Sequence, residues 1–265
     1  AWDILFAKAD SAPSRAIAGS RVRAGADGRE AVASTDLVIS AVTAAQDIEA
    51  ARSVAPYLPR GAYFLDLNSV SPGAKQEAHR VIESTGAKYV EVAIMSPIAP
   101  RRIASPMLLG GPHAAAFQPL ARELGFEGAQ VFSDQVGRAS AAKMCRSVIV
   151  KGLESLLCES LLSARRYGVE DTVLESLRSL FATDNWQTQS RYMISRSLIH
   201  GRRRAEEMRE VARTVAEAGL EPWMSSACAR WQDLAAGYRE AEAQERLHEM
   251  LDAILARHAR QERPR

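Results

Sequence analysis

Cysteine, histidine and long apolar runs are all scarce in this sequence. Their scarcity argues against structural disulfides, metal sites and membrane spans, respectively. The three cysteines, Cys145, Cys158 and Cys228, are odd in number and lack the spacing of a CxxC or metal site. They are typical of a reducing, cytoplasmic environment without structural disulfides. The five histidines show no metal-binding spacing either, so no metal is expected. No apolar run approaches the roughly 18 residues of a membrane span, and no signal-peptide pattern is visible.

Aromatic residues and net charge are also low. Aromatic residues make up 6% of the chain, and 34 basic residues against 32 acidic ones leave a formal net charge of +2. Nucleic-acid surfaces need basic patches and stacking rings, so neither nucleic acid nor a membrane surface is an expected partner. The hydrophobic fraction of 47% is ordinary for a folded protein, and 265 residues suffice for one large domain or two ordinary ones.

The dinucleotide fingerprint G-x-G-x-x-G is missing as well. Its glycines let a backbone approach a pyrophosphate closely at the start of a helix. Neither the glycines at 25–28 nor those at 110–111 follow a strand and open a helix at that spacing. Ala1 and Trp2 look like the tail of a strand. We therefore expect a first strand, a glycine loop and a helix upstream of Ala1, or a protein that has lost its phosphate cradle.

What the first half does contain is an alternation of strands and helices. β-Branched and apolar runs predict strands at 37–42, 61–66, 89–95, 106–109 and 128–132. Amphipathic segments predict helices at 44–55, 74–85 and 113–124. This alternation predicts an α/β fold with a Rossmann-like, doubly wound and mostly parallel sheet whose first strand and helix are missing.

The second half reads almost entirely as helix. One long helix is predicted at 139–167, followed by helices at 170–181, 186–200, 203–218, 222–236 and 240–257. We therefore predict a Rossmann-like domain at 1–136 and an all-α domain at 137–265. Apolar stripes in the helical half favour a homodimer, and they include Leu153, Leu156, Leu157, Leu161 and Leu174.

Ligands of open α/β sheets bind at the carboxyl ends of the strands, so the residues there are candidates for a site. Asp3 would follow the first visible strand, where an acid accepts hydrogen bonds from an adenine ribose; a plain turn aspartate is the alternative. The next strand ends in Ala41, Val42 and Thr43. Side chains this small let a flat cofactor approach the backbone, although Thr43 equally suits an ordinary helix cap.

The loop 66–72, with sequence DLNSVSP, gathers short polar side chains after another strand. Asn68 and Ser69 in this loop can hydrogen-bond a carboxylate or a nicotinamide. Ordinary turn formation by Asx and serine residues explains the same composition.

The order of these strand ends, the stretch EVAIMSP and Gly137-x5-Lys143 resembles the β-hydroxyacid dehydrogenase superfamily, which includes 6-phosphogluconate and 3-hydroxyisobutyrate dehydrogenases. DLNSVSPGAKQ, LLGGPHAAAF, VGRASAAKMCRSVIVKGLESLL, ARRYGVED and HGRRRAEEMREVA resemble a narrower branch more closely. Its members are phosphogluconate-dehydrogenase-like, NAD-binding proteins with a distinctive C-terminal domain. The resemblance extends to about Gly237.

The resemblance implies an NAD(P)-dependent oxidoreductase acting on a small 3-hydroxy acid, with NAD or NADP as cofactor. Lys143 would be the catalytic general acid or base. Asn68 and Ser69 would face the nicotinamide and the substrate, and Ser96 would lie in the substrate-binding turn. A lysine suits proton transfer when burial or neighbouring positive charge favours its neutral amine.

Two departures from the superfamily concern the substrate. Pro97 and Ile98 stand where two glycines commonly follow Ser96, and Ser147 stands where an asparagine usually follows the lysine by four residues. Helical spacing puts Ser147 on the face of Lys143, and Arg146 lies one step around. We expect Ser69, Ser96, Arg146 and Ser147 to contact an anionic substrate.

Two other functions stay open at this point. An imine or keto reductase of the same superfamily would not need Lys143. A non-catalytic fragment or binding protein would explain the missing glycine loop.

Overall fold

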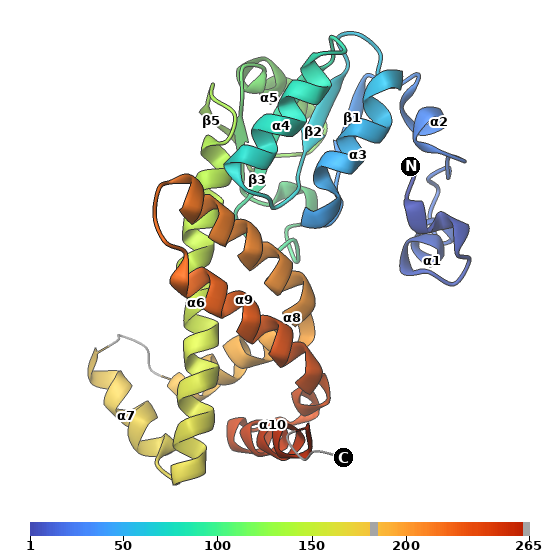
Figure 1. Cartoon of the computed structure of the whole chain (residues 1–265). Helices are drawn as coiled ribbons and strands as arrows, with labels where there is room; N and C mark the ends of the chain where they lie inside the picture. The colour runs from blue at the N-terminus through green and yellow to red at the C-terminus, as the bar shows by residue number, and fades with distance from the viewer. Residues whose placement is uncertain (181–184, 262–265) are drawn as a thin grey trace. The chain divides into compact units, whose positions relative to one another are not determined.

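The computed structural model describes residues 1–180 and 185–261 (Figure 1). The chain divides into two compact units, Ala1–Lys143 and Met144–Arg265. Within the described ranges, no helix combines the length and apolar character that crossing a bilayer requires.

A five-stranded sheet forms the centre of the first unit. Its strands are β1 (Leu37–Ser40), β2 (Tyr63–Asp66), β3 (Lys88–Ile94), β4 (Met107–Gly110) and β5 (Ala129–Ser133), and they lie side by side in that order. All neighbouring pairs are parallel except β3 and β4, which run antiparallel. The register places Ser40 opposite Asp66 and Asp66 opposite Glu91. Three polar residues therefore form a row across the sheet.

Helices cover both faces of this sheet. The larger ones are α3 (Asp47–Val54), α4 (Pro72–Glu83) and α5 (Ala114–Glu123). Phe64 packs with α3 and α4, and the next residue of β2, Leu65, packs with α5 on the other face, as Figure 1 shows for the helices. Because successive strand residues point to opposite faces, β2 is buried on both sides.

Short helices complete the first unit. They are α1 (Ala12–Ala18), α2 (Gly28–Val32) and the 3-10 turns η1 (Ile4–Ala7), η2 (Ala44–Gln46), η3 (Ala55–Tyr57) and η4 (Arg102–Ala104).

The predicted strand tail before Asp3 is wrong. Ala1 and Trp2 have no strand structure, and Asp3 is the N-cap of η1, where its carboxylate accepts the Leu5 N–H at 2.8 Å. A short acidic side chain bonds its own downstream backbone readily, and this favours a turn over a strand.

The second unit is built from helices. They are α6 (Arg138–Tyr167), which begins in the first unit, α7 (Glu170–Leu180), α8 (Trp186–Glu217), α9 (Trp223–Ala235), the 3-10 segment η5 (Ala236–Ala243) and α10 (Leu247–Gln261). Phe181, the predicted last residue of α7, lies outside the described residues. Leu157, Leu161 and Leu174 pack in the core of this unit, whereas Leu156 is 52% exposed.

The two helices predicted at 186–200 and 203–218 are one continuous helix, α8. Gly201 does not interrupt it. A Cβ atom at this position would lie 2.4 Å from the Gln232 carbonyl oxygen and 2.9 Å from the Ala236 nitrogen. The glycine therefore allows α8 to approach α9 and η5 closely. From the sequence alone, such a glycine cannot be told from one that ends a helix.

Candidate functional site

The start of α6 is held by a buried carboxylate from the sheet. Glu91 on β3 is 0% exposed and accepts the Gly137 N–H at 2.7 Å and the Ser140 N–H at 2.5 Å. A Cβ atom on Gly110 would lie 2.5 Å from Glu91 Oε2, so only glycine there leaves room for the carboxylate. Burial raises the pKa of Glu91, and Lys75 together with the two N–H groups opposes that rise. Glu91 therefore caps α6 and fixes where the helix begins.

Lys143 lies in the second turn of α6, beside the loop that follows β2. Its Nζ donates to Ser69 Oγ at 2.6 Å, and both side chains are half-buried. One turn earlier, the Ser140 hydroxyl donates to the Val70 carbonyl oxygen. Two contacts thus fasten the loop to α6 and bring an amine and a hydroxyl together. This pair can pass a proton to or from a substrate hydroxyl.

Asn68 in the same loop ties the ends of β1 and β2 together. Its Nδ2 donates to Ser40 Oγ at 2.9 Å and to Asp47 Oδ1 at 2.7 Å, and its Oδ1 accepts the Val42 N–H at 2.6 Å. Asn68 is 4% exposed. Both of its amide hydrogens are used inside the protein, so the geometry favours a positioning role for Asn68 over direct hydrogen-bond donation to a ligand.

A buried ion pair lies beneath this loop. Lys75 Nζ contacts Asp66 Oδ1 at 2.7 Å and donates to the Asp66 carbonyl oxygen at 3.0 Å. The Tyr89 hydroxyl donates to Asp66 Oδ2 at 2.6 Å, and burial raises the pKa of Tyr89 well above its usual value. Ordering the loop through buried, mutually bonded groups makes its conformation well defined.

The structure brings some predicted site residues together. Lys143 contacts Ser69, and the preceding residue of the same loop, Asn68, contacts Val42. Ala41 and Thr43 are exposed beside Val42 at the end of β1.

Other predicted residues lie elsewhere along the chain. Asp3 bonds only its own turn in the hydrogen bonds described, and the Ser96 hydroxyl donates to the Pro97 carbonyl oxygen at 3.0 Å. Arg146 is exposed and Ser147 is buried on the next turn of α6, in the second unit. The roles assigned to these residues remain predictions.

Sequence reasoning missed Asp47, Lys75 and Glu91. Glu91 carried the clearest signal, because it interrupts an otherwise apolar predicted strand and a buried carboxylate needs partners. Asp47 and Lys75 looked like ordinary polar residues of amphipathic helices. Only the packing of α3 and α4 on the sheet shows that both are buried.

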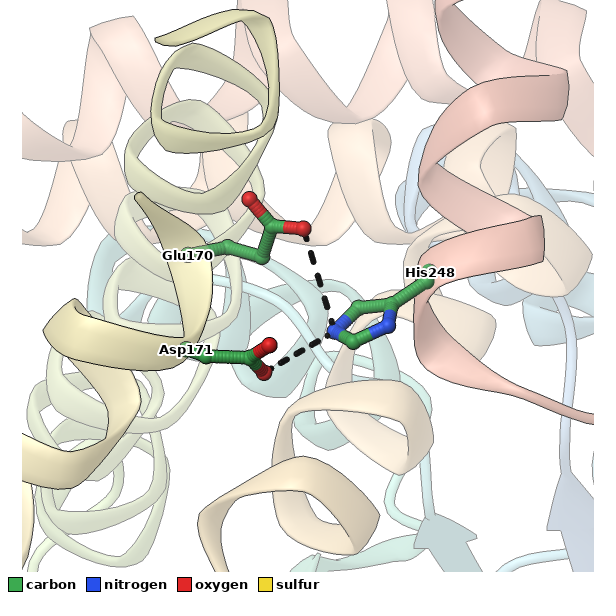
Figure 2. A group of neighbouring side chains, drawn as sticks. All are labelled: Glu170, Asp171 and His248. Atoms are coloured by element: carbon green, nitrogen blue, oxygen red, sulfur yellow. Dashed lines mark ion pairs between the residues drawn. The ribbon is translucent and has the colours of Figure 1, made fainter. Parts of the chain in front are cut away.

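A second cluster of titratable residues joins α7 and α10 of the second unit (Figure 2). His248 Nε2 of α10 lies 3.2 Å from Asp171 Oδ1 and 3.9 Å from Glu170 Oε1. The three side chains are of metal-ligating types and close enough to share an ion. Arg165 already pairs with Glu170 and donates to both carboxylate oxygens of Asp252, which lowers the pKa of Asp252. The cluster is therefore a salt-bridge network whose cation is a guanidinium.

Comparison with known families and proteins places both halves of the chain. The sequence profile of the NAD binding domain of 6-phosphogluconate dehydrogenase matches residues 2–133, and a domain of unknown function, DUF1932, matches residues 164–234. An uncharacterised 28.5 kDa protein of Methanothermus fervidus, from the 5′ region of its 7S RNA, is 31% identical over 198 residues. These residues cover 75% of each chain.

Solved structures agree with this assignment. A conserved hypothetical protein from Sinorhizobium meliloti 1021 is 32% identical, with a TM-score of 0.72 over 97% of this chain and 87% of that one. The conserved protein MTH1747, noted for its similarity to 3-hydroxyacid dehydrogenases, is 29% identical, with a TM-score of 0.65 over 93% and 86%.

A more distant structure shares the fold alone. The 3-hydroxyisobutyrate dehydrogenase of Mycobacterium tuberculosis, solved with L-serine, is 18% identical, with a TM-score of 0.65 over 92% of this chain and 87% of that one. The two profile matches, together with the Methanothermus fervidus and Sinorhizobium meliloti proteins, show that this chain belongs to the family of 6-phosphogluconate-dehydrogenase-like, NAD-binding proteins that carry a DUF1932 domain.

Proposed function

We propose that this protein is an NAD(P)-dependent oxidoreductase that transfers a hydride between a nicotinamide cofactor and a small 3-hydroxy acid. The observation that carries the proposal is the 2.6 Å contact between Lys143 Nζ and Ser69 Oγ at the carboxyl end of β2. In an open α/β sheet this edge is where ligands bind. Residues 1–136 would hold the cofactor, and the helices from 137 onward would supply the lysine and the remaining substrate contacts.

The end of β1 fits the nicotinamide half of the cofactor. Ala41, Val42 and Thr43 are exposed and small, and Asn68 fixes the Val42 amide. The bound cofactor would supply or accept the hydride. The G-x-G-x-x-G fingerprint, which binds the pyrophosphate, does not occur in these 265 residues. The cofactor contacts proposed for this chain are therefore those at the end of β1, to the nicotinamide half.

Lys143 would carry the proton that accompanies hydride transfer. During oxidation its neutral Nζ accepts the proton of the substrate hydroxyl, and during reduction its ammonium returns that proton. Ser69 Oγ accepts a hydrogen bond from Nζ, so the Ser69 hydroxyl keeps its own hydrogen to donate to the substrate. We also assign substrate contacts to Ser96, Arg146 and Ser147, since a carboxylate needs hydroxyl and cationic partners.

We further propose that the second unit forms a homodimer. Ile149 is 73% exposed and Leu156 is 52% exposed on α6, and a Cβ atom on Gly152 between them would meet no other atom. An exposed apolar stripe on a long helix is typical of an association surface. Sedimentation of wild-type protein and of Ile149→Glu tests this: the wild type should sediment as a dimer and the variant as a monomer.

The activity is tested by screening small 3-hydroxy acids, 3-hydroxyisobutyrate among them, with NAD and NADP while monitoring the reduced nicotinamide. We expect turnover of at least one acid with one of the two cofactors. Turnover of imines only, unchanged in Lys143→Ala, would favour the imine reductase alternative. Failure of both NADH and NADPH to bind the protein would favour a non-catalytic role.

A further inference from the structure

One buried carboxyl close to the proposed site has no use in the mechanism above. Asp47, the first residue of α3, is 3% exposed. Its Oδ1 accepts from Asn68 Nδ2, but its Oδ2 is buried and receives no hydrogen bond from any described donor. An ionised carboxylate left this way in a dry interior is costly, whereas a protonated one becomes a donor itself.

The charges facing Asp47 lead to the same conclusion. Asp66 of β2 approaches it, and Lys75 of α4 is the cation nearby, but Lys75 already pairs with Asp66. Tyr89 of β3 directs its hydroxyl to Asp66, and β1 contributes only the uncharged Ser40 hydroxyl, through Asn68. Elsewhere on α3, Arg52 pairs with Glu77 of α4 at the surface. One buried cation thus lies near both carboxyl groups, and ionising the second costs more than ionising the first because the two charges repel.

We infer that Asp47 is a positioning residue that acts in its protonated form, with its hydroxyl directed to Asp66 and its Oδ1 holding Asn68. Asn68 then fixes the Val42 N–H at the proposed cofactor edge and the loop that carries Ser69. The effect of Asp47 on cofactor binding rests on the proposed function, although the protonation of Asp47 can be measured without any ligand. In agreement with the geometry, burial and then Asp66 raise the pKa of Asp47 from 3.8 to about 7.

The expected pH dependence follows from that direction. The unfolded chain releases this proton near pH 3.8 and the folded chain near pH 7, so folding stability from this group falls as pH rises between the two values. Above that window a second carboxylate forms beside Asp66 and repels it. An ionised Asp47 accepts more strongly from Asn68 Nδ2, but its repulsion from Asp66 shifts the carboxylate that Asn68 follows, so we expect the Val42 amide to move and cofactor affinity to fall.

The direct test is a carbon NMR titration of wild-type protein labelled at the aspartate carboxyl carbons. We expect one carboxyl with a midpoint near pH 7, absent from Asp47→Asn and unchanged in Glu49→Gln, which removes an exposed acid from the same helix. The inference is overturned if every aspartate titrates below about pH 5, as unperturbed carboxyls do.

The second measurement is NADH and NADPH affinity at about pH 6 and about pH 9, on either side of the expected midpoint. Wild-type and Glu49→Gln proteins should bind severalfold more weakly at the higher pH, whereas Asp47→Asn should bind equally at both. Equal pH dependence in all three proteins would overturn the positioning role. If neither cofactor binds at either pH, the proposed function fails, and the carboxyl titration alone still decides the protonation of Asp47.

Asp47→Asn can fail to fold, and a second variant covers that case. Ser40→Ala removes one partner of Asn68 but no titrating group. It should weaken cofactor binding at both pH values and leave the aspartate midpoint in place. Unchanged affinity in Ser40→Ala would contradict the role given to the Asn68 anchor.

Discussion

Buried charged groups serve different ends in the two units. In the first unit, Asp66, Lys75 and Glu91 lie under the carboxyl edge of the sheet, and their bonds fix one loop and one helix start. In the second unit, buried Arg204 pairs with buried Glu154 between α8 and α6, and the half-buried Lys151 and Glu207 pair between the same helices. The first set converges on the half-buried loop that carries Ser69, whereas the second joins packed helices. We therefore take buried charge as a sign of the proposed site only where its bonds lead to the loop that carries Ser69.

The largest expected effect comes from removing the cation of each buried pair. Lys75→Met leaves Asp66 buried without its cation, and Arg204→Met does the same to Glu154. Each should lower the free energy of unfolding by about 3–5 kcal/mol in urea titrations. Among folded molecules, only Lys75→Met should also weaken NADH or NADPH binding. Equal loss of cofactor affinity in both variants would contradict the claim that only the buried pair of the first unit supports the proposed cofactor site.

Gly201→Ala is expected to have the next largest effect. Its Cβ would lie 2.4 Å from the Gln232 carbonyl oxygen, which is too close without movement of α9. Overpacking of this kind costs about 1–3 kcal/mol, measured by denaturant unfolding. Gly152→Ala on α6 is the matched control, compared in the Ile149→Glu background so that the proposed dimer contact plays no part, because open space surrounds that position in the single chain and alanine favours a helix. Destabilisation by both substitutions would contradict the close approach of α8 to α9.

Glu91→Gln should act on both stability and turnover. The Gly137 and Ser140 N–H groups donate to different oxygens of Glu91, and a carboxamide has only one acceptor oxygen, so glutamine can replace one of the two bonds and turns its NH2 group toward the other N–H. We expect a loss of about 1 kcal/mol in unfolding free energy. We also expect a lower kcat, because the turn before Lys143 is less firmly held. An unchanged kcat with reduced stability would limit Glu91 to a structural role.

The smallest effect is expected from a surface pair of the second unit. Arg246 and Glu249 are 80% and 40% exposed, and solvent screens their attraction. Arg246→Ala should leave the thermal midpoint and the kinetic constants unchanged. A clear drop in the midpoint would show that exposed pairs stabilise this unit more than its buried pairs suggest.

Local patterns predicted most of the fold, because strands and helices depend on residues close in sequence. The predicted strand at 61–66 corresponds to Tyr63–Asp66, and the predicted helix at 139–167 to Arg138–Tyr167. The patterns failed where a residue is required by a contact with a distant segment. Gly201 is an example, because it faces the backbone of another helix. The predicted strand before Asp3 was wrong because the Asp3 side chain forms a local hydrogen bond that favours a turn.

The candidate site was predictable in part for the same reason. Lys143 and Ser69 each stood in a recognisable stretch of sequence, and the structure places them in contact. Asn68 was expected near a ligand, but its bonds to Ser40 and Asp47 come from segments 28 and 21 residues away. No periodicity in the sequence could reveal those partners.

The central claim is that Lys143 moves the proton in hydride transfer, and replacing it tests the claim most directly. Lys143→Ala should lower kcat by about 10²- to 10⁴-fold while NADH or NADPH affinity stays nearly unchanged. Lys8→Ala, at an exposed lysine of the same unit, should match the wild type in both measurements. An unchanged rate in Lys143→Ala, or loss of cofactor binding together with turnover, would contradict the account.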